Sequence, residues 1–345
     1  MNLNTRILSL CFLILAPAKI FAWGDLGHST VGYLAETRLT AKAKGFINSF
    51  MGSEPLAVSA VWPDLVRSDE RFADFAPFHY LEIPLGMKFK DISPEKRAPK
   101  DAASIIENVP NLLLDNSLSN NDKALLFRYL VHIVGDVHQP LHIGNGLDRG
   151  ANLCDVKFRA RNSFLSKETN LHNLWDNSMV DELKELVIEN AKKEKKLMGY
   201  FQYPYLGAYL EKNFEKTFSP EELNKISSAT PEIWFEESQA LHSVVYPDKI
   251  AISDPKLRAY CKFVDPSTHK INETNYKKSK IPTLDKRYVA KVLPVIEERL
   301  FKAGIRLAYL LNNLAEKSHT KKLEKENEAI SINKVLEHLK NQPTK

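Results

Sequence analysis

Apolar residues recur along most of the chain at the three- and four-residue spacing that marks one face of a helix. This spacing predicts a first helix through Val31 and Leu39, followed by helices over 41–50, 55–67, 102–114, 122–137, 181–196, 200–218, 231–246 and 285–314. Alternating patterns are confined to Phe78–Pro84 and Cys154–Arg159. We therefore expect an all-α fold, a single multi-helix domain with a small β-hairpin.

The two ends of the chain differ from this pattern. Arg6, the apolar run Ile7–Ala16 and the small residue Ala22 have the layout of a signal peptide, and the run is too short to span a bilayer. Residues 1–22 are therefore expected to be removed, leaving an exported domain over 23–315 that begins at Trp23. Residues 316–345 form a charged tail, which is either mobile or folds into one short helix around Val335.

Composition narrows the class of protein further. The chain is 43% hydrophobic and 26% charged, which is typical of a soluble domain with a substantial core. Its three cysteines are too few for a disulfide scaffold or a zinc–thiolate protein, and whether Cys154 and Cys261 pair in an oxidising compartment stays open. The net charge of +5 fits a polyanionic substrate, but also an ordinary lysine-rich surface. No other segment is long enough to cross a membrane either, so we expect no stable membrane insertion.

The stretch Phe127–His142, FRYLVHIVGDVHQPLH, carries the most unusual polar pattern. His132 and Asp136 lie four residues apart and therefore share one helical face. Pro140 ends the helix, and His142 follows just beyond it. A buried helix does not need this many groups of the kind that bind metals.

The rest of the chain supplies partners of the same chemical kind. Each of them, taken alone, also fits an ordinary surface or core residue. His172 and Asp176 form a second histidine–aspartate pair at four-residue spacing, which makes an ordinary surface or core role a weaker explanation. The additional donors are His28, Asp64, His79, His172 and Asp176, together with the free amino group and carbonyl of Trp23 if cleavage falls directly before it. Nitrogen and carboxylate donors without a thiolate favour catalytic zinc. Their number fits two or three ions, and close metal pairs are suited to phosphoryl displacement.

These motifs resemble those of the secreted zinc-dependent single-strand-specific nucleases and 3′-nucleotidases of the mung bean nuclease type. That family has a trinuclear-zinc, all-helical fold that it shares with bacterial phospholipase C. The matching segments run from Trp23 to about Leu314 and read WGDLGH, WPD, HY, HIVGDVHQPLH, NLHNLWD, ESQALHSVVY and AGIRLAYLLN.

The resemblance implies three zinc sites. One comprises Asp64, His79, His132 and Asp136; a second comprises Trp23, His28 and the shared Asp136; a third comprises His142, His172 and Asp176. It also implies catalytic roles for Arg67, which contacts phosphate, and for Asp64. Tyr80 would stack on a nucleobase, and Asn152 would contact substrate. His138 is not a ligand in the family.

Two departures from the family pattern concern the site. Ala151 stands where the family loop usually has a second glycine before Asn152, so its methyl group can shift that asparagine. Glu82 stands where the family commonly has aspartate. The resemblance implies hydrolysis of single-stranded DNA and RNA to 5′-phosphate products, and of 3′-nucleotides. We expect a monomer that is secreted or periplasmic. A zinc phospholipase C and a non-catalytic zinc-binding protein are the alternatives.

Overall fold

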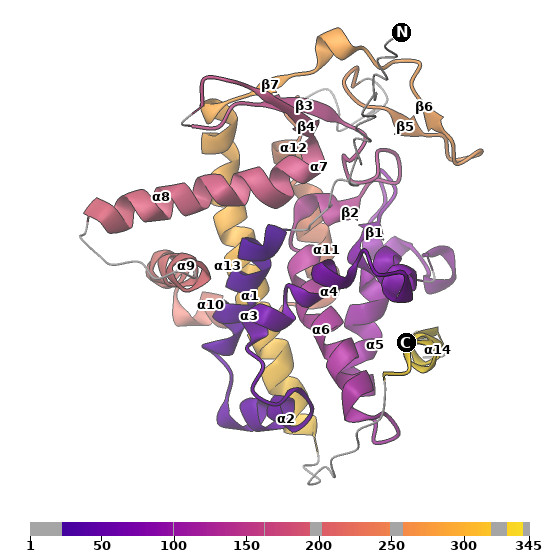
Figure 1. Cartoon of the computed structure of the whole chain (residues 1–345), viewed down its shortest axis with the longest axis vertical. Helices are drawn as coiled ribbons and strands as arrows, with labels where there is room; N and C mark the ends of the chain where they lie inside the picture. The colour runs from indigo at the N-terminus through magenta and orange to yellow at the C-terminus, as the bar shows by residue number, and fades with distance from the viewer. Residues whose placement is uncertain are drawn as a thin grey trace, which may run out of the picture.

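Helices make up most of the computed structural model (Figure 1), which describes residues 23–98, 100–161, 163–193, 202–248, 258–318 and 330–340. The expected signal peptide, residues 1–22, lies outside this part of the chain. The longer helices are α1 (Gly24–Glu36), α2 (Ala41–Met51), α5 (Ala102–Leu114), α6 (Asn120–Asp136), α8 (Met179–Lys193), α9 (Tyr203–Thr217), α10 (Pro220–Ser227), α11 (Pro231–Ala240), α13 (Lys286–Lys317) and α14 (Ile332–Lys340). The expectation of an all-α fold is confirmed.

Helix α6 runs through the middle of the molecule. It begins after Ser119, whose side chain accepts a hydrogen bond from the Asp122 backbone N–H at 3.1 Å. It packs against α5, α2 and α13, and the 32-residue α13 in turn lies along α1. Because α6 is covered on nearly every side, its apolar residues fill the core and its polar ones need partners inside the protein.

Short segments connect these helices around the end of α6. The helices α3 (Leu56–Ser59), α4 (Trp62–Val66), α7 (Leu171–Asn173) and α12 (His242–Val245) are each a single turn, and η4 (Pro140–His142) is a 3₁₀ turn. Helix α4 packs against both α3 and α6. Short turns rather than long helices therefore lie beside the buried C-terminal end of α6.

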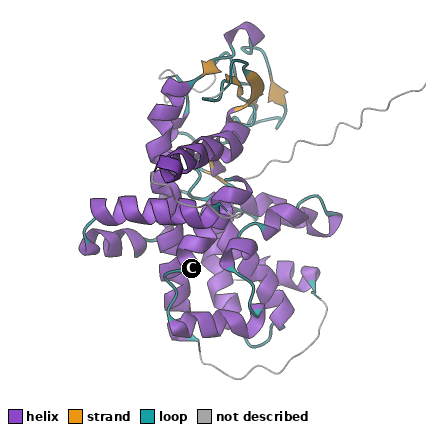
Figure 2. Cartoon of the chain, turned by 60° about the vertical axis from the view of Figure 1, so that its left-hand side comes forward, coloured by secondary structure: helices purple, strands orange, loops and turns teal. Residues whose placement is uncertain are grey.

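Most of the strands lie at one end of the molecule (Figure 2), and one short pair lies nearer its middle (Figure 1). β3 (Asp155–Phe158) and β4 (Lys167–Asn170) form the expected hairpin, and β7 (Thr283–Leu284) adds to β3 in parallel. β1 (Leu81–Glu82) pairs in parallel with β2 (Ile143–Gly144), and β5 (Phe263–Val264) pairs with β6 (Ile271–Asn272). The β1–β2 pair ties the segment after His79 to the segment after His142.

Part of the segment expected to be extended is helical. Residues Phe78 and His79 end the 3₁₀ helix η1 (Glu70–His79), and extended backbone begins only at Tyr80. The reason is that Phe72, Phe75 and Phe78 recur every third residue and are all buried, which matches the three-residue turn of a 3₁₀ helix. The alternation seen in the sequence therefore starts two residues later than it was placed.

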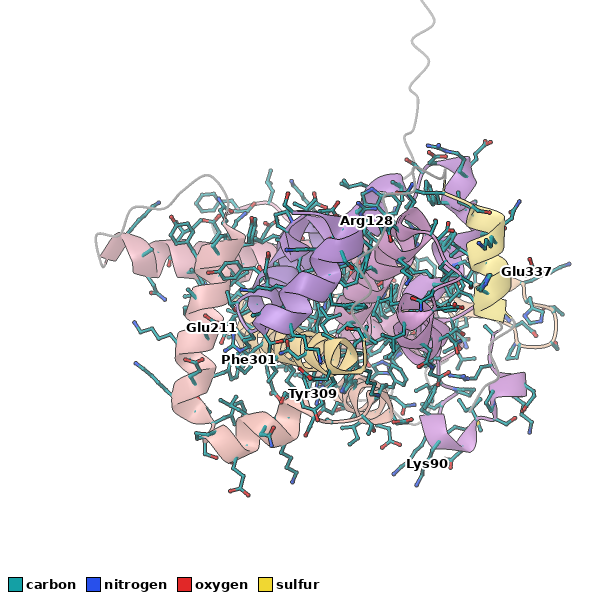
Figure 3. The ribbon with its side chains drawn as sticks, turned by 90° about the horizontal axis from the view of Figure 1, so that it is seen from below. Lys90, Arg128, Glu211, Phe301, Tyr309 and Glu337 are labelled. Atoms are coloured by element: carbon teal, nitrogen blue, oxygen red, sulfur yellow. A yellow bond between two sulfur atoms is a disulfide. The ribbon has the colours of Figure 1, made fainter. Side chains whose placement is uncertain are left out.

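A disulfide and the packing of a C-terminal helix hold two further segments to the rest of the fold. Cys154 and Cys261 form a disulfide, which links the loop before β3 to the segment that carries β5 and β6. Helix α14, which carries Glu337, lies at the edge of the molecule beside α5 and α6 (Figure 3). Its residues Val335 and Leu336 are buried there. No described helix has the length and apolar character needed to cross a bilayer.

Candidate metal centre

The predicted donors on α6 meet donors from three other elements at its C-terminal end. His132 and Asp136 project from α6, His28 from α1, Asp64 from α4 and His79 from the end of η1. Helices α1, α4 and α6 lie together near the centre of the molecule (Figure 1). All five side chains are buried, none more than 6% exposed.

Asp136 lies between two groups of donors. Its Oδ1 is 3.2 Å from His28 Nε2, whereas its Oδ2 is 3.1 Å from His79 Nδ1 and 3.3 Å from His132 Nε2. The groups His28–His132–Asp136 and Asp64–His79–His132 each place three donor atoms within 4.8 Å of one another. His132 reaches both groups, but Nε2 has one lone pair. Of these two residues, Asp136 alone has two oxygens and can therefore serve two ions at once.

A third group lies past the end of α6. His142, His172 and Asp176 also bring their donor atoms within 4.8 Å of one another, with His172 Nε2 3.3 Å from Asp176 Oδ2. His172 lies on α7, and Asp176 lies in the π-helical turn Leu174–Ser178 that follows. The wider π turn changes the helical register but still leaves both side chains on one side, as their spacing predicted.

Backbone carbonyls fix the orientation of three histidine rings. The Nδ1 atoms of His132, His142 and His172 lie 2.6 Å from the carbonyl oxygens of Ala60, His79 and Gly150, respectively. A carbonyl can only accept, so Nδ1 carries the proton and Nε2 points into the site. This arrangement is typical of metal-binding histidines. His79 is the exception, because its Nδ1 faces the other donors.

Unpaired buried atoms provide a test of whether metal ions fit this site. Within the described part of the chain, several donor atoms are buried and have no hydrogen-bond partner: both ring nitrogens of His28, one oxygen each of Asp64, Asp136 and Asp176, and Nε2 of His142. A buried polar atom without a partner costs about 1–3 kcal/mol. The donor set contains imidazole and carboxylate groups that face one another, as cations require. The residues therefore fit bound metal ions.

The charges at the site are strongly perturbed. Burial lowers the pKa of His28 to about 4 and that of His79 to about 3, so both rings are neutral at pH 7. Burial also raises the pKa of Asp64 to about 7. Burial opposes the charged form of His132 too, but the carboxylates of Asp136 and Asp64 outweigh it and raise that pKa to about 9. Asp64 therefore has too few cationic partners of its own. At Asp136 burial, which raises the pKa, is outweighed by His132 and His142, and the pKa of that carboxyl lies well below its ordinary value.

Two glycines allow the close approaches that the centre requires. A Cβ at Gly135 would lie 2.9 Å from His28 Nδ1, so a side chain there would displace the ring. A Cβ at Gly150 would lie 2.2 Å from the Leu141 carbonyl oxygen, and the φ of Gly150 is +58°. Gly150 also supplies the carbonyl that orients His172.

Ala151 has a left-handed backbone as well, with φ of +63°, and is completely buried. Left-handed backbone costs a residue with a Cβ about 1–2 kcal/mol. The next residue, Asn152, donates from its amide to the Arg149 carbonyl at 3.0 Å, and its side-chain oxygen is buried without a hydrogen-bond partner.

The other predicted site residues surround the donors. Arg67 is 29% exposed, with a guanidinium nitrogen 3.9 Å from Asp64 Oδ1. Tyr80 follows His79 directly and is 42% exposed. Trp23 is completely buried, and its indole N–H donates to the Gly135 carbonyl at 2.9 Å, next to Asp136. Glu82 accepts a hydrogen bond from the Gly146 backbone, and burial raises its pKa to about 7.

Sequence reasoning missed Gln139, whose side-chain amide donates to Asp176 Oδ1 at 2.7 Å. Its position inside HIVGDVHQPLH was the available signal, but the sequence does not show which side chain it meets. His138, set aside as a ligand, is engaged at both ring nitrogens, by the Val134 carbonyl and by Arg306. The contacts with Asp176 and Arg306 join distant segments, whereas Val134 lies only four residues before His138.

This fold and centre define a class of protein, a helical protein whose described residues include three donor groups able to hold metal ions. A sequence model of the S1/P1 Nuclease family matches residues 23–316, and the chain belongs to this family. It is therefore a nuclease, a hydrolase of phosphodiester bonds.

Two relatives of this family match nearly the whole chain, and a third matches about half of it. Nuclease S1 of Aspergillus oryzae is 27% identical over 318 residues, which cover 90% of this chain and 98% of that protein. Endonuclease 3 of Arabidopsis thaliana is 29% identical over 331 residues, which cover 91% and 96%. Nuclease P1 of Penicillium citrinum is 30% identical over 167 residues, which cover 47% and 59%.

Proposed function

We propose that this protein is a zinc-dependent endonuclease that cleaves single-stranded DNA and RNA to 5′-phosphate products and also hydrolyses 3′-nucleotides. The main support is the position of Asp136, whose two oxygens face different donor groups. Zinc ions, when bound, lower the pKa of a coordinated water and neutralise charge on a phosphate. Nitrogen and oxygen donors without thiolate suit such catalytic zinc.

The donor geometry supports three ions. Asp64, His79 and His132 would hold one ion, and His28 with the Trp23 terminus would hold a second. Asp136 would contribute one oxygen to each of these two sites, as its position between the groups allows. His142, His172 and Asp176 would hold the third ion, and their backbone-fixed rings need little reorganisation to do so.

The residues around the ions would bind the substrate. Arg67 is partly exposed beside Asp64, so its guanidinium can pair with a phosphate without leaving the site. The exposed ring of Tyr80 can stack on an unpaired base, and stacking tolerates any base. The side-chain oxygen of Asn152 has no hydrogen-bond partner among the described residues, but it is buried, so a substrate group would reach it only after the loop at Ala151 shifts.

A substrate panel tests this function. Denatured DNA, duplex DNA, RNA, a 3′-mononucleotide and phosphatidylcholine should be assayed side by side with a count of bound zinc. We expect hydrolysis of the single-stranded polymers and the 3′-mononucleotide, with about three zinc ions per chain, and loss of activity after exhaustive chelation. Preferred cleavage of phosphatidylcholine would support the phospholipase alternative. Zinc binding without any hydrolysis, or full activity without zinc, would refute the proposal.

The backbone of Trp23 would become a ligand only after cleavage directly before it, because an amide nitrogen cannot replace a free amine. A protein that keeps one extra residue before Trp23 is therefore expected to bind one zinc ion fewer and to lose activity at least about tenfold. Zinc analysis and kinetics on the two forms, with the N-terminus of each verified by mass spectrometry, provide the measurement. Equal zinc content and activity would exclude Trp23 as a ligand.

The same cleavage bears on location. The basic, apolar and small-residue layout of residues 1–22 supports export to a periplasm or the medium. The disulfide between Cys154 and Cys261 suits an oxidising compartment. We propose that the mature enzyme acts there as a monomer. Fractionation of producing cells, followed by size-exclusion chromatography of the mature protein, would test both statements.

A further inference from the structure

Gln139 connects the two halves of the metal centre. It follows Asp136 by three residues and precedes His142 by three, and it is completely buried. Its backbone N–H donates to the Asp136 carbonyl at 2.9 Å, and its own carbonyl accepts from the His142 N–H at 3.0 Å. The backbone of Gln139 is therefore fixed between a donor of the bridged pair of sites and a donor of the third site.

The side-chain amide of Gln139 has only one reasonable orientation. Its Oε1 accepts from the backbone N–H of Leu141 at 2.6 Å, and its Nε2 donates to Asp176 Oδ1 at 2.7 Å. Exchanging the two atoms would place an NH₂ group against an N–H and a carbonyl oxygen against a carboxylate. Both contacts would then be repulsive, so the hydrogen-bond pattern identifies Gln139 as the donor to Asp176.

This hydrogen bond makes the two oxygens of Asp176 different. Oδ1 accepts the hydrogen bond from Gln139 and lies 3.8 Å from His142 Nε2. Oδ2 is buried, has no hydrogen-bond partner among the described residues and lies 3.3 Å from His172 Nε2. The amide thus holds the carboxylate so that its free oxygen faces the histidine. Partners of this kind orient metal ligands, and losing one lowers metal affinity about 10–100-fold.

We propose that Gln139 is a positioning residue that sets the affinity of the third metal site by orienting Asp176. It contacts Asp176 through its side chain and shares a backbone turn with His142, so it acts on two donors of that group. The inference rests on the metal centre proposed above and adds a residue that would bind neither metal nor substrate itself.

Replacing Gln139 with methionine tests this inference, because methionine has a similar length and volume but cannot donate to Asp176. Stepwise competition with a chelator on the zinc-loaded protein measures the dissociation constant of each ion. We expect one ion to bind about 10–100-fold more weakly and the other two to keep their wild-type constants. Gln139→Asn, which is one methylene too short to reach Asp176, should give the same result if the methionine variant folds poorly.

A double-mutant cycle separates positioning from a general structural role. Asp176→Ala should remove the third ion, and adding Gln139→Met to it should then change no remaining zinc constant. Gln239→Met is the matched control, because among the described residues the Gln239 amide donates only to the Met87 carbonyl, at the surface. Its zinc constants should equal those of the wild type.

If all three zinc dissociation constants of the Gln139 variants equal those of the wild type, or if all three ions bind equally more weakly, Gln139 does not position Asp176. Either result would leave the proposed metal centre unaffected. A wild-type protein that takes up no zinc would overturn the metal centre itself.

Discussion

Replacing Asp136 with asparagine is expected to reduce the bound zinc from three ions to one and to lower kcat/KM at least about 10³-fold. Asparagine keeps the shape of the side chain but has one neutral oxygen, so it cannot face His28 and His79 with two anionic oxygens as Asp136 does. The third group shares no residue with these two and should keep its ion. Metal analysis and steady-state kinetics on denatured DNA measure both effects.

The same substitution at the other end of α6 provides the control. Asp122 is also buried, but its carboxylate interacts with Ser119 and with the backbone N–H of Ser331. It lies 14 residues from Asp136, a distance of about 21 Å along the helix. Asp122→Asn should therefore lower stability and leave three ions in place. If Asp136→Asn keeps three ions and activity within tenfold of the wild type, the bridging role is wrong.

Helical spacing made much of this arrangement predictable. The pairs His132–Asp136 and His172–Asp176 lie four residues apart, and a helix brings such residues together whatever the rest of the chain does. The structure places both pairs within 3.3 Å. The all-α fold was predictable for a similar reason, because apolar spacing reports which side of each helix is buried.

The remaining features depend on contacts between distant segments. No spacing rule shows that His79 turns Nδ1, rather than Nε2, toward the other donors, because its ring is placed by η1 and the strand that follows. The π turn at Asp176 was also hidden, since a residue pattern distinguishes poorly between α and π turns. The sequence showed which donors exist, and tertiary packing decides how each one is turned.

A second consequence of such packing is a charge network behind the metal centre, in which two buried arginines share one partly exposed carboxylate. Glu237 on α11 pairs with Arg299 at 2.5 Å and with Arg306 at 2.7 Å, both on α13. Arg299 also donates to the carbonyl of His138, two residues after Asp136. The network therefore joins α11 and α13 to the end of the helix that carries the central carboxylate.

Replacing Glu237 with glutamine is expected to lower the free energy of unfolding by about 3 kcal/mol at pH 7. The side chains of Arg299 and Arg306 are only 1% exposed and cannot lose their charge, so each would lose its carboxylate partner inside the protein. Urea unfolding of both proteins after zinc removal measures the difference. Glu316→Gln is the control, because Glu316 and Lys42 form an exposed pair, which should contribute less than about 1 kcal/mol.

The effect of Glu237→Gln should also depend on pH with a defined sign. Burial alone would raise the pKa of Glu237, but the hydrogen bond from Arg306 and the charges of Arg299, Arg306 and Lys302 outweigh it and lower the pKa to about 2. Because the folded pKa lies below the ordinary value of 4.5, the carboxylate stabilises the fold above about pH 4.5. That stabilisation is lost as the pH falls toward 2. The difference in free energy of unfolding between wild type and variant should therefore be constant from pH 7 to pH 5 and shrink below pH 4.5. A difference that grows on acidification would show that the guanidinium groups do not depend on Glu237.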